Sequence, residues 1–179
     1  AYTHFNLNPS KKTVLIIGGS LGARTINESI LASLGKFAEA DVQLLWQTGK
    51  NFTKAQGINQ QGVRIETFIY EMNLAYAIAD VVISRAGALS IAELAQVKKP
   101  VILVPSPNVA EDHQTKNAMA LVERDAAILV RDADAKNNLV NECLNLVANE
   151  AKQVQLKNNI ATFAMPDAAD RIVTEVLRV

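Results

Sequence analysis

A glycine-rich turn is the first feature of this chain that could do chemistry. In VLIIGGSLGARTINESI, residues 14–30, an apolar run leads through a Gly-Gly-Ser sequence into a helical pattern. Glycine permits unusual backbone angles and leaves no side chain to block a ligand. The amides that open the next helix, together with the helix dipole, favour an anion. We therefore predict that Gly19, Ser20 and Gly22 hold a phosphate group.

The glycine turn is a weak signal on its own. GGSLGA lacks the Lys-Ser/Thr ending of a Walker A loop and is not a GxGxxG sequence. The alternative is a tight strand-to-helix turn without a ligand. Arg24 also leaves two interpretations open. It lies one helical turn further on, where it can reach an anion or pair with Glu28 at i,i+4.

Residues 80–95, DVVISRAGALSIAELA, offer a second position of the same kind. A strand pattern runs into an Arg-Ala-Gly turn before the next helix. The amides of Ala88, Leu89 and Ser90 at that helix start predict a second anion site. Glu93 can reach outward to the hydroxyls of a ribose. It can instead cap free amides, because Ser90 and Glu93 have capping-box spacing.

Residues 101–121, VILVPSPNVAEDHQTKNAMAL, form a third strand-to-helix connection. Two prolines stiffen the loop, and His113 and Gln114 stand at the opening of the helix. Amide and imidazole groups supply the fixed donors and acceptors that sugar recognition needs. We expect this loop to contact a sugar. The alternative is a solvated helix cap that begins at Glu111-Asp112.

Apolar runs of strand length alternate with segments of helical period along most of the chain. The expected strands are residues 13–17, 42–47, 63–68, 81–84, 101–104 and 127–130, and the expected helices are residues 23–34, 72–78, 89–96 and 114–123. The remaining C-terminal segment is expected to be mostly helical. Met165-Pro166-Asp167 should break it, because proline stops one helix and aspartate caps the next.

Steady alternation of strand and helix implies parallel pairing through right-handed crossovers. Runs such as VVIS and VILV lack polar residues, as expected for strands that are covered on both faces. We predict an α/β fold, a doubly wound Rossmann-like parallel sheet of about six strands with helices on both faces. A ligand would bind beyond the carboxyl ends of the strands, where the three loops could share a diphosphate, a ribose and a sugar.

Composition argues against several functional classes. Lys plus Arg and Asp plus Glu both total 18, so no basic excess supports a nucleic-acid partner. The apolar runs are far shorter than the ~20 residues of a membrane helix. His4 and His113 lack the spacing of metal ligands, so we expect no metal and no cofactor. The single cysteine, Cys143, fits an apolar helix position and has no internal disulfide partner.

Four motifs together resemble the C-terminal half of the bacterial MurG-type N-acetylglucosaminyltransferases. They are GGSLGAR, FIYEM at residues 68–72, SRAGALSIAEL and PVILVPSPNVAEDHQTKNA. That family has the two-domain glycosyltransferase B fold, and this chain resembles one half of it. The resemblance runs from about Lys11 to the final helix. It implies that residues 1–10 are the remnant of an interdomain linker and that residues 11–179 are a UDP-sugar donor-binding domain.

The resemblance also implies a reaction. Full-length members transfer N-acetylglucosamine from UDP-N-acetylglucosamine to the lipid-linked muramoyl-pentapeptide of peptidoglycan synthesis, at the cytoplasmic face of the cell membrane. An N-terminal domain would carry the catalytic base, the acceptor site and the membrane-facing surface. None of these can be located in this sequence, so we expect no catalytic residue here. The chain alone should bind the donor weakly and should not turn it over.

Motif positions carry the family's binding roles onto this sequence. Ser20 would meet the diphosphate, and Ile69 would contact uracil through its backbone groups, unless it is simply a core residue. Glu93 would take the ribose hydroxyls. Ala88, Leu89 and Ser90 would line the phosphates and sugar, and Gln114 would take the N-acetylglucosamine hydroxyls with His113 beside it. Gly19, Gly22 and Arg24 complete the candidate set.

Two other functions remain open from the sequence. One is a stand-alone UDP-sugar-binding subunit of a two-chain N-acetylglucosaminyltransferase, which a partner chain recruits to the membrane. The other is a non-catalytic nucleotide-binding module that uses the same sheet. Such a module would bind UDP without regard to the attached sugar.

Overall fold

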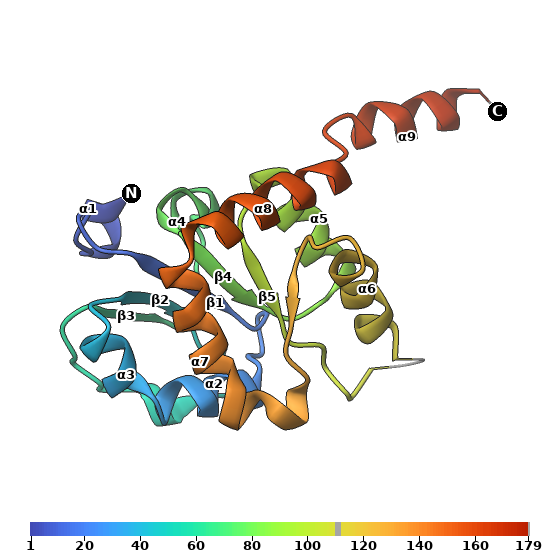
Figure 1. Ribbon diagram of the computed structural model, residues 1–179. Helices are drawn as coiled ribbons and strands as arrows, with labels where there is room; N and C mark the ends of the chain where they lie inside the picture. The colour runs from blue at the N-terminus through green and yellow to red at the C-terminus, as the bar shows by residue number, and fades with distance from the viewer. Residues whose placement is uncertain (110–111, 179) are drawn as a thin grey trace.

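Six parallel strands form one sheet in the order β3-β2-β1-β4-β5-β6 (Figure 1). The computed structural model describes residues 1–109 and 112–178. Its strands are β1 (Thr13–Ile17), β2 (Gln43–Gln47), β3 (Val63–Glu66), β4 (Val81–Ser84), β5 (Val101–Leu103) and β6 (Ile128–Leu129). The strand order reverses between β1 and β4, so the sheet is doubly wound as predicted.

Helices cover both faces of the sheet and divide the core into two layers (Figure 1). One face packs against α2 (Arg24–Leu31), α3 (Leu34–Glu39) and α7 (Ala135–Ala148), and the other against α4 (Met72–Ile78), α5 (Ala88–Val97) and α6 (His113–Val122). On β1, Val14 and Ile16 face the first layer, and Leu15 and Ile17 face the second. Because side chains alternate along a strand, a strand buried on both faces is apolar throughout.

Most predicted boundaries agree with the structure to within two residues. The single helix expected over residues 23–34 is wrong, since α2 ends at Leu31 and α3 begins at Leu34. Ser33 between them has φ −128° and ψ 18°, which are not helical angles. The strand expected over residues 63–68 ends at Glu66, and the following residues form a loop.

The C-terminal part is helical as predicted. After α7 come α8 (Glu150–Ile160) and α9 (Ala168–Leu177), separated at the predicted Met165-Pro166-Asp167 break. Asp167 occupies the N-cap position of α9, but its side chain accepts no capping hydrogen bond there, which corrects the predicted cap. α9 extends away from the body of the molecule (Figure 1), and none of its residues is buried.

The first residues of the chain pack onto this domain. A short helix, α1 (Tyr2–Phe5), places Phe5 in the second core layer, where Leu7 joins it. The backbone N–H of Asn8 donates to Oε1 of Gln43 at 2.9 Å. The segment is therefore held against the amino ends of the strands. No helix in the described ranges is both long and apolar enough to cross a membrane.

Candidate functional site

A cavity of about 720 Å³ lies at the carboxyl ends of the strands, where the strand order reverses. Its wall includes Ile17 and Ser84, which end β1 and β4, and Gln47, which ends β2. Loops after β3 and β5 close the sides. The volume is within the range of small-molecule sites, and the position is where a doubly wound sheet binds its ligand.

The glycine turn joins β1 to α2 and lines this cavity. Gly19 and Gly22 have positive φ angles of 81° and 86°. A side chain on Gly22 would also collide with the backbone, because its Cβ would lie 2.1 Å from the carbonyl oxygen of Thr48. Nothing lies within 4 Å of a Cβ built on Gly19. Gly22 therefore allows the turn after β1 to pack against the turn after β2, and Gly19 leaves space at the cavity.

The two helix starts at the cavity have no side-chain caps. α2 follows Ala23 and α5 follows Gly87, and neither start receives a capping hydrogen bond from a side chain. The first amides of a helix have no partner within the helix. Ala23, Thr25, Gly87 and Ser90 all line the cavity, so both starts face it. Their amides and dipoles make the cavity suitable for an anion with two phosphate groups.

Glu93 lines the same cavity but does not form the predicted capping box. The box would need Ser90 as N-cap, whereas the N-cap is Gly87 and Glu93 is the sixth residue of α5. The hydroxyl of Tyr76 on α4 instead donates to Oε2 of Glu93 at 3.2 Å. Burial raises the pKa of Tyr76 strongly, and the charge of Glu93 raises it further. The hydroxyl therefore stays protonated and keeps donating.

Arg24 forms the i,i+4 pair that the sequence left open. Its Nε lies 3.1 Å from Oε1 of Glu28, and its side chain is 84% exposed at the rim of the cavity. Lys54 approaches the same carboxylate at 3.3 Å. The hydrogen bonds from Arg24 and Lys54 lower the pKa of Glu28. In this structure the Arg24 charge is thus paired on the surface.

Gln114 lines the cavity, whereas His113 does not. Oε1 of Gln114 accepts a hydrogen bond from the backbone N–H of Ser106 at 2.9 Å, which ties α6 to the proline-rich loop. His113 is exposed at the first residue of α6. Asp112 occupies the N-cap position of α6 but makes no side-chain capping hydrogen bond to the helix backbone; its Oδ1 accepts from the Thr115 hydroxyl at 2.6 Å. Glu111, the other residue of the alternative cap, lies outside the described residues.

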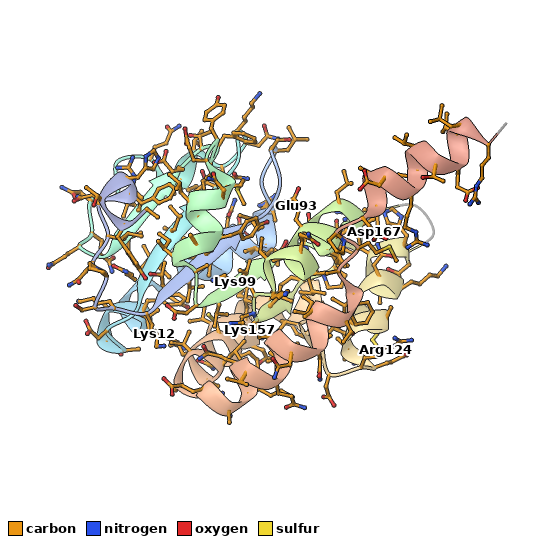
Figure 2. The ribbon with its side chains drawn as sticks, turned by 90° about the horizontal axis from the view of Figure 1, so that it is seen from above. Lys12, Glu93, Lys99, Arg124, Lys157 and Asp167 are labelled. Carbon is orange, nitrogen blue, oxygen red and sulfur yellow. The ribbon has the colours of Figure 1, made fainter. Side chains whose placement is uncertain are left out.

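The structure gathers most of the predicted site residues. Those that line the cavity are Gly19, Ser20, Gly22, Arg24, Ile69, Ser90, Glu93 and Gln114. Ala88 and Leu89 do not line it, and the side chain of Leu89 is 81% exposed. The cavity lies at the carboxyl ends of the strands, and Figure 2 shows Glu93 on α5 well apart from Lys12, which precedes β1. The candidate residues therefore belong to the carboxyl edge of the sheet.

Ile69 is a core residue that also lines the cavity. Its side chain is 2% exposed and packs in the second core layer. Its backbone N–H donates to Oε1 of Gln47 at 2.9 Å. Sequence reasoning missed Gln47. The available signal was a glutamine at the end of the otherwise apolar run LLWQ, where a buried polar group must find partners.

Sequence reasoning also missed an ion pair between Arg85 and Asp132 at the cavity wall. Their side chains are 16% and 17% exposed. Nη1 of Arg85 also donates to the carbonyl oxygens of Val104 at 3.0 Å and Pro105 at 3.1 Å. Oδ2 of Asp132 accepts from the Thr25 hydroxyl at 2.8 Å. This cluster joins the loops after β4, β5 and β6 to the start of α2.

The site residues do not form a metal centre. Within residues 1–109 and 112–178, no group of three or more His, Cys, Asp or Glu side chains could hold a metal ion. The cavity offers amides, hydroxyls, carboxamides and the Glu93 carboxylate, with Arg24 at its rim and the Arg85–Asp132 ion pair in its wall. That set of groups is suited to a phosphorylated polar ligand.

This chain is similar in sequence to curated proteins. The transferase named UDP-N-acetylglucosamine--N-acetylmuramyl-(pentapeptide) pyrophosphoryl-undecaprenol N-acetylglucosamine transferase from Cytophaga hutchinsonii is 53% identical over 180 residues, which cover all of this chain and 49% of that protein. The protein of the same name from Porphyromonas gingivalis strain ATCC 33277 is 54% identical over 171 residues, or 93% of this chain and 45% of its own length. This chain spans about half the length of the curated relatives it matches.

Solved structures match as well. MurG from Acinetobacter baumannii superposes with a TM-score of 0.82 at 27% identity, over 99% of this chain and 53% of that one. The C-terminal CMP-Kdo binding domain of WaaA from the same organism shares the fold, with a TM-score of 0.61 at 13% identity over 90% of this chain. The family model for the glycosyltransferase family 28 C-terminal domain matches residues 13–172. The chain belongs to this glycosyltransferase family, as its C-terminal domain.

Proposed function

We propose that this chain is the donor-binding half of an inverting glycosyltransferase. The whole protein would transfer N-acetylglucosamine from UDP-N-acetylglucosamine to the lipid-linked muramoyl-pentapeptide of peptidoglycan synthesis. The observation that carries the proposal is the meeting of two uncapped helix starts, α2 and α5, at one cavity of the sheet. The names of relatives that are 53% and 54% identical support the choice of donor and acceptor.

The donor would lie across the carboxyl ends of β1 and β4. Its diphosphate would sit between the glycine turn with Ser20 and the start of α5 with Ser90, and Glu93 would accept hydrogen bonds from the ribose hydroxyls. Ala88 and Leu89 do not line the cavity, so only their backbone amides at the start of α5 would act toward the diphosphate. The sugar would extend toward Gln114. His113 is the first residue of α6 and does not line the cavity, so it would lie next to Gln114 without a contact to the sugar.

The base would lie against the loop after β3. The Ile69 N–H already donates to Gln47, so the carbonyl of Ile69 is the backbone group that we assign to uracil. A carbonyl accepts the N3–H of uracil without a dedicated side chain. Phe68 also lines the cavity and would cover the ring.

The chemical contribution of this half would be to stabilise the departing diphosphate. Charge develops on the phosphate oxygen as the glycosidic bond breaks, and the amides that open α2 and α5 would bind that charge. The base that accepts the acceptor's proton would come from the N-terminal domain of the whole protein. Residues 1–10 would join that domain to residues 11–179. The whole protein would work at the cytoplasmic face of the membrane.

Calorimetry with UDP, UDP-N-acetylglucosamine and UDP-glucose tests the proposal. We expect UDP-N-acetylglucosamine to bind more tightly than UDP-glucose, because the sugar pocket would recognise the N-acetylglucosamine ring. Ser20→Ala tests the contact with the diphosphate. Ser10→Ala is its matched control, because Ser10 is an exposed serine beside the amino ends of the strands. Equal affinities for the three compounds would favour the nucleotide-binding module instead.

A further inference from the structure

We propose that Gln47 is the positioning residue that sets the preference for uracil, by fixing the base-binding loop against the phosphate-binding turn. The inference rests on the proposed function, because it assigns the base to the loop that contains Ile69. Gln47 acts through the backbone of its two neighbours in this proposal. It needs no direct contact with the reacting atoms.

One side chain connects two site loops. Gln47 ends β2, is 5% exposed and lines the cavity. Its Nε2 donates to the carbonyl oxygen of Gly19 at 3.2 Å, in the glycine turn after β1. Its Oε1 accepts the backbone N–H of Ile69 at 2.9 Å, in the loop after β3. The carboxamide thus spans the two loops that would hold the phosphates and the base.

The orientation of this carboxamide is determined by its partners. Gly19 offers an acceptor and Ile69 offers a donor, so a flipped amide would face oxygen with oxygen and nitrogen with N–H. Backbone bonds reinforce the same connection, since Thr48 donates to the Glu66 carbonyl at 2.9 Å and Gly49 donates to the Thr67 carbonyl at 3.1 Å. Gln47 therefore fixes the position of the Ile69 peptide relative to the glycine turn.

This arrangement has a consequence for base choice. Because Gln47 engages the Ile69 N–H, the backbone group left for the base in this proposal is the Ile69 carbonyl, an acceptor. A carbonyl opposite N3 can accept the N3–H of uracil, whereas the lone pair on N3 of cytosine would be repelled there; the N4 amino group of cytosine is a donor but lies at a different position on the ring. A loop that loses its link to Gln47 can move, and the N–H that Gln47 held becomes available to cytosine.

Gln43 provides a matched control within the same strand. It is also a buried glutamine, and it begins β2 where Gln47 ends it. Its side chain donates to the Asn8 carbonyl and the Thr13 hydroxyl at 2.8 Å, at the amino edge of the sheet. Substitution of either glutamine removes a comparable buried network. Only one of the two networks touches the cavity.

The test compares Gln47→Met, Gln43→Met and wild type by calorimetry with UDP and CDP, below the melting temperature of each variant. We expect Gln47→Met to lose about tenfold in UDP affinity and to lose most of the preference for UDP over CDP. Gln43→Met should keep both, even where it melts earlier. An unchanged preference in folded Gln47→Met, or an equal loss in Gln43→Met, would overturn the inference.

Gln47→Glu keeps the acceptor for the Ile69 N–H and loses the donor to Gly19. We expect it to bind both nucleotides more weakly while it retains the preference for UDP. This variant decides the question if Gln47→Met fails to fold, because loss of the preference in Gln47→Glu would contradict the inference. Wild type that binds neither nucleotide would instead reject the proposed function itself.

Discussion

The Tyr76 hydroxyl on α4 donates to the Glu93 carboxylate on α5, across 3.2 Å at the edge of the cavity. Tyr76 is mostly buried and anchors one end of the contact, whereas Glu93 is exposed. The Glu93 carboxylate is therefore held in place by Tyr76 although Glu93 itself is not part of the core. A carboxylate that is positioned in this way is preorganised to accept hydrogen bonds from a ligand.

Replacement of Glu93 tests its assignment to the ribose. We expect Glu93→Ala to weaken UDP binding by roughly 1–3 kcal/mol, because hydrogen bonds to a charged acceptor are lost. Tyr76→Phe should weaken it less, since the carboxylate remains but is no longer held. Calorimetry measures both variants. Unchanged affinity together with a lower melting temperature for Glu93→Ala would assign Glu93 to stability alone.

Gln114 tests the sugar end of the site. We expect Gln114→Ala to keep UDP affinity within about twofold and to reduce the preference for UDP-N-acetylglucosamine over UDP. The control is Gln114→Glu, which keeps the acceptor for the Ser106 N–H and loses the amide donors. If Gln114→Ala weakens UDP itself while Gln114→Glu does not, Gln114 acts by holding the loop and not by contacting the sugar.

The sequence predicted the sheet well because most of the β strands are short, largely apolar runs with a turn signal behind them. β1 and β4 match their predicted ranges, and their ends locate the cavity. The break after α2 was missed because Ser33 interrupts an amphipathic pattern that continues into α3. A local sequence pattern shows which segments carry apolar side chains. It does not show where a single residue adopts backbone angles outside the helical range.

The candidate site was predicted from backbone motifs, and that prediction missed the network of side-chain contacts in the site. Helix starts and glycines can be recognised within a few residues of sequence. Arg85 forms an ion pair with Asp132, which is 47 residues away in the sequence, and Gln47 accepts a hydrogen bond from Ile69, which is 22 residues away. Only the pairing of strands brings such residues together. The capping interpretation of Glu93 failed for a related reason, because a shift of the helix start to Ala88 moves Glu93 out of the first turn.

The Arg85 and Asp132 pair should couple the cavity wall to the stability of the domain. We expect Asp132→Ala to lower the free energy of unfolding by about 1–3 kcal/mol, less than for a fully buried pair because water reaches both groups. Thr25→Val removes only the 2.8 Å hydrogen bond to Asp132 and should cost about 0.5–1.5 kcal/mol. Urea unfolding of the single and double variants measures the coupling. Strictly additive losses would show that the cluster does not act as a unit.

Cys143 should make the domain sensitive to alkaline pH. Burial raises the pKa of the Cys143 thiol from 9.0 to about 12. Between these values the unfolded chain releases a proton that the folded chain keeps, so the free energy of unfolding falls as pH rises. The slope should approach about 1.4 kcal/mol per pH unit above pH 9, and the effect fades out over about one pH unit below that value.

The pH effect is isolated by comparison with Cys143→Ala. Tyr76, whose pKa is also raised by burial, adds a loss in the same direction at higher pH in both proteins. Urea unfolding between pH 8 and 10 should therefore show a shallower decline for Cys143→Ala, whatever the offset that the smaller side chain introduces. Parallel curves for the two proteins would contradict the assignment to the thiol.

Removal of α9 should leave the folded domain almost unchanged. None of its residues is buried, and Ile172, Val173, Val176 and Leu177 expose their side chains to solvent. A chain shortened to residues 1–164 should melt within about 2 °C of the full chain, because no core contact is lost. Leu156→Ala in α8 is the contrasting variant, since Leu156 is fully buried and its truncation should cost about 2–5 kcal/mol. An amphipathic helix this short is marginal by itself, so circular dichroism should show a loss of helix no larger than its ten residues. A large drop in melting temperature on removal would mean that α9 packs on the domain in solution.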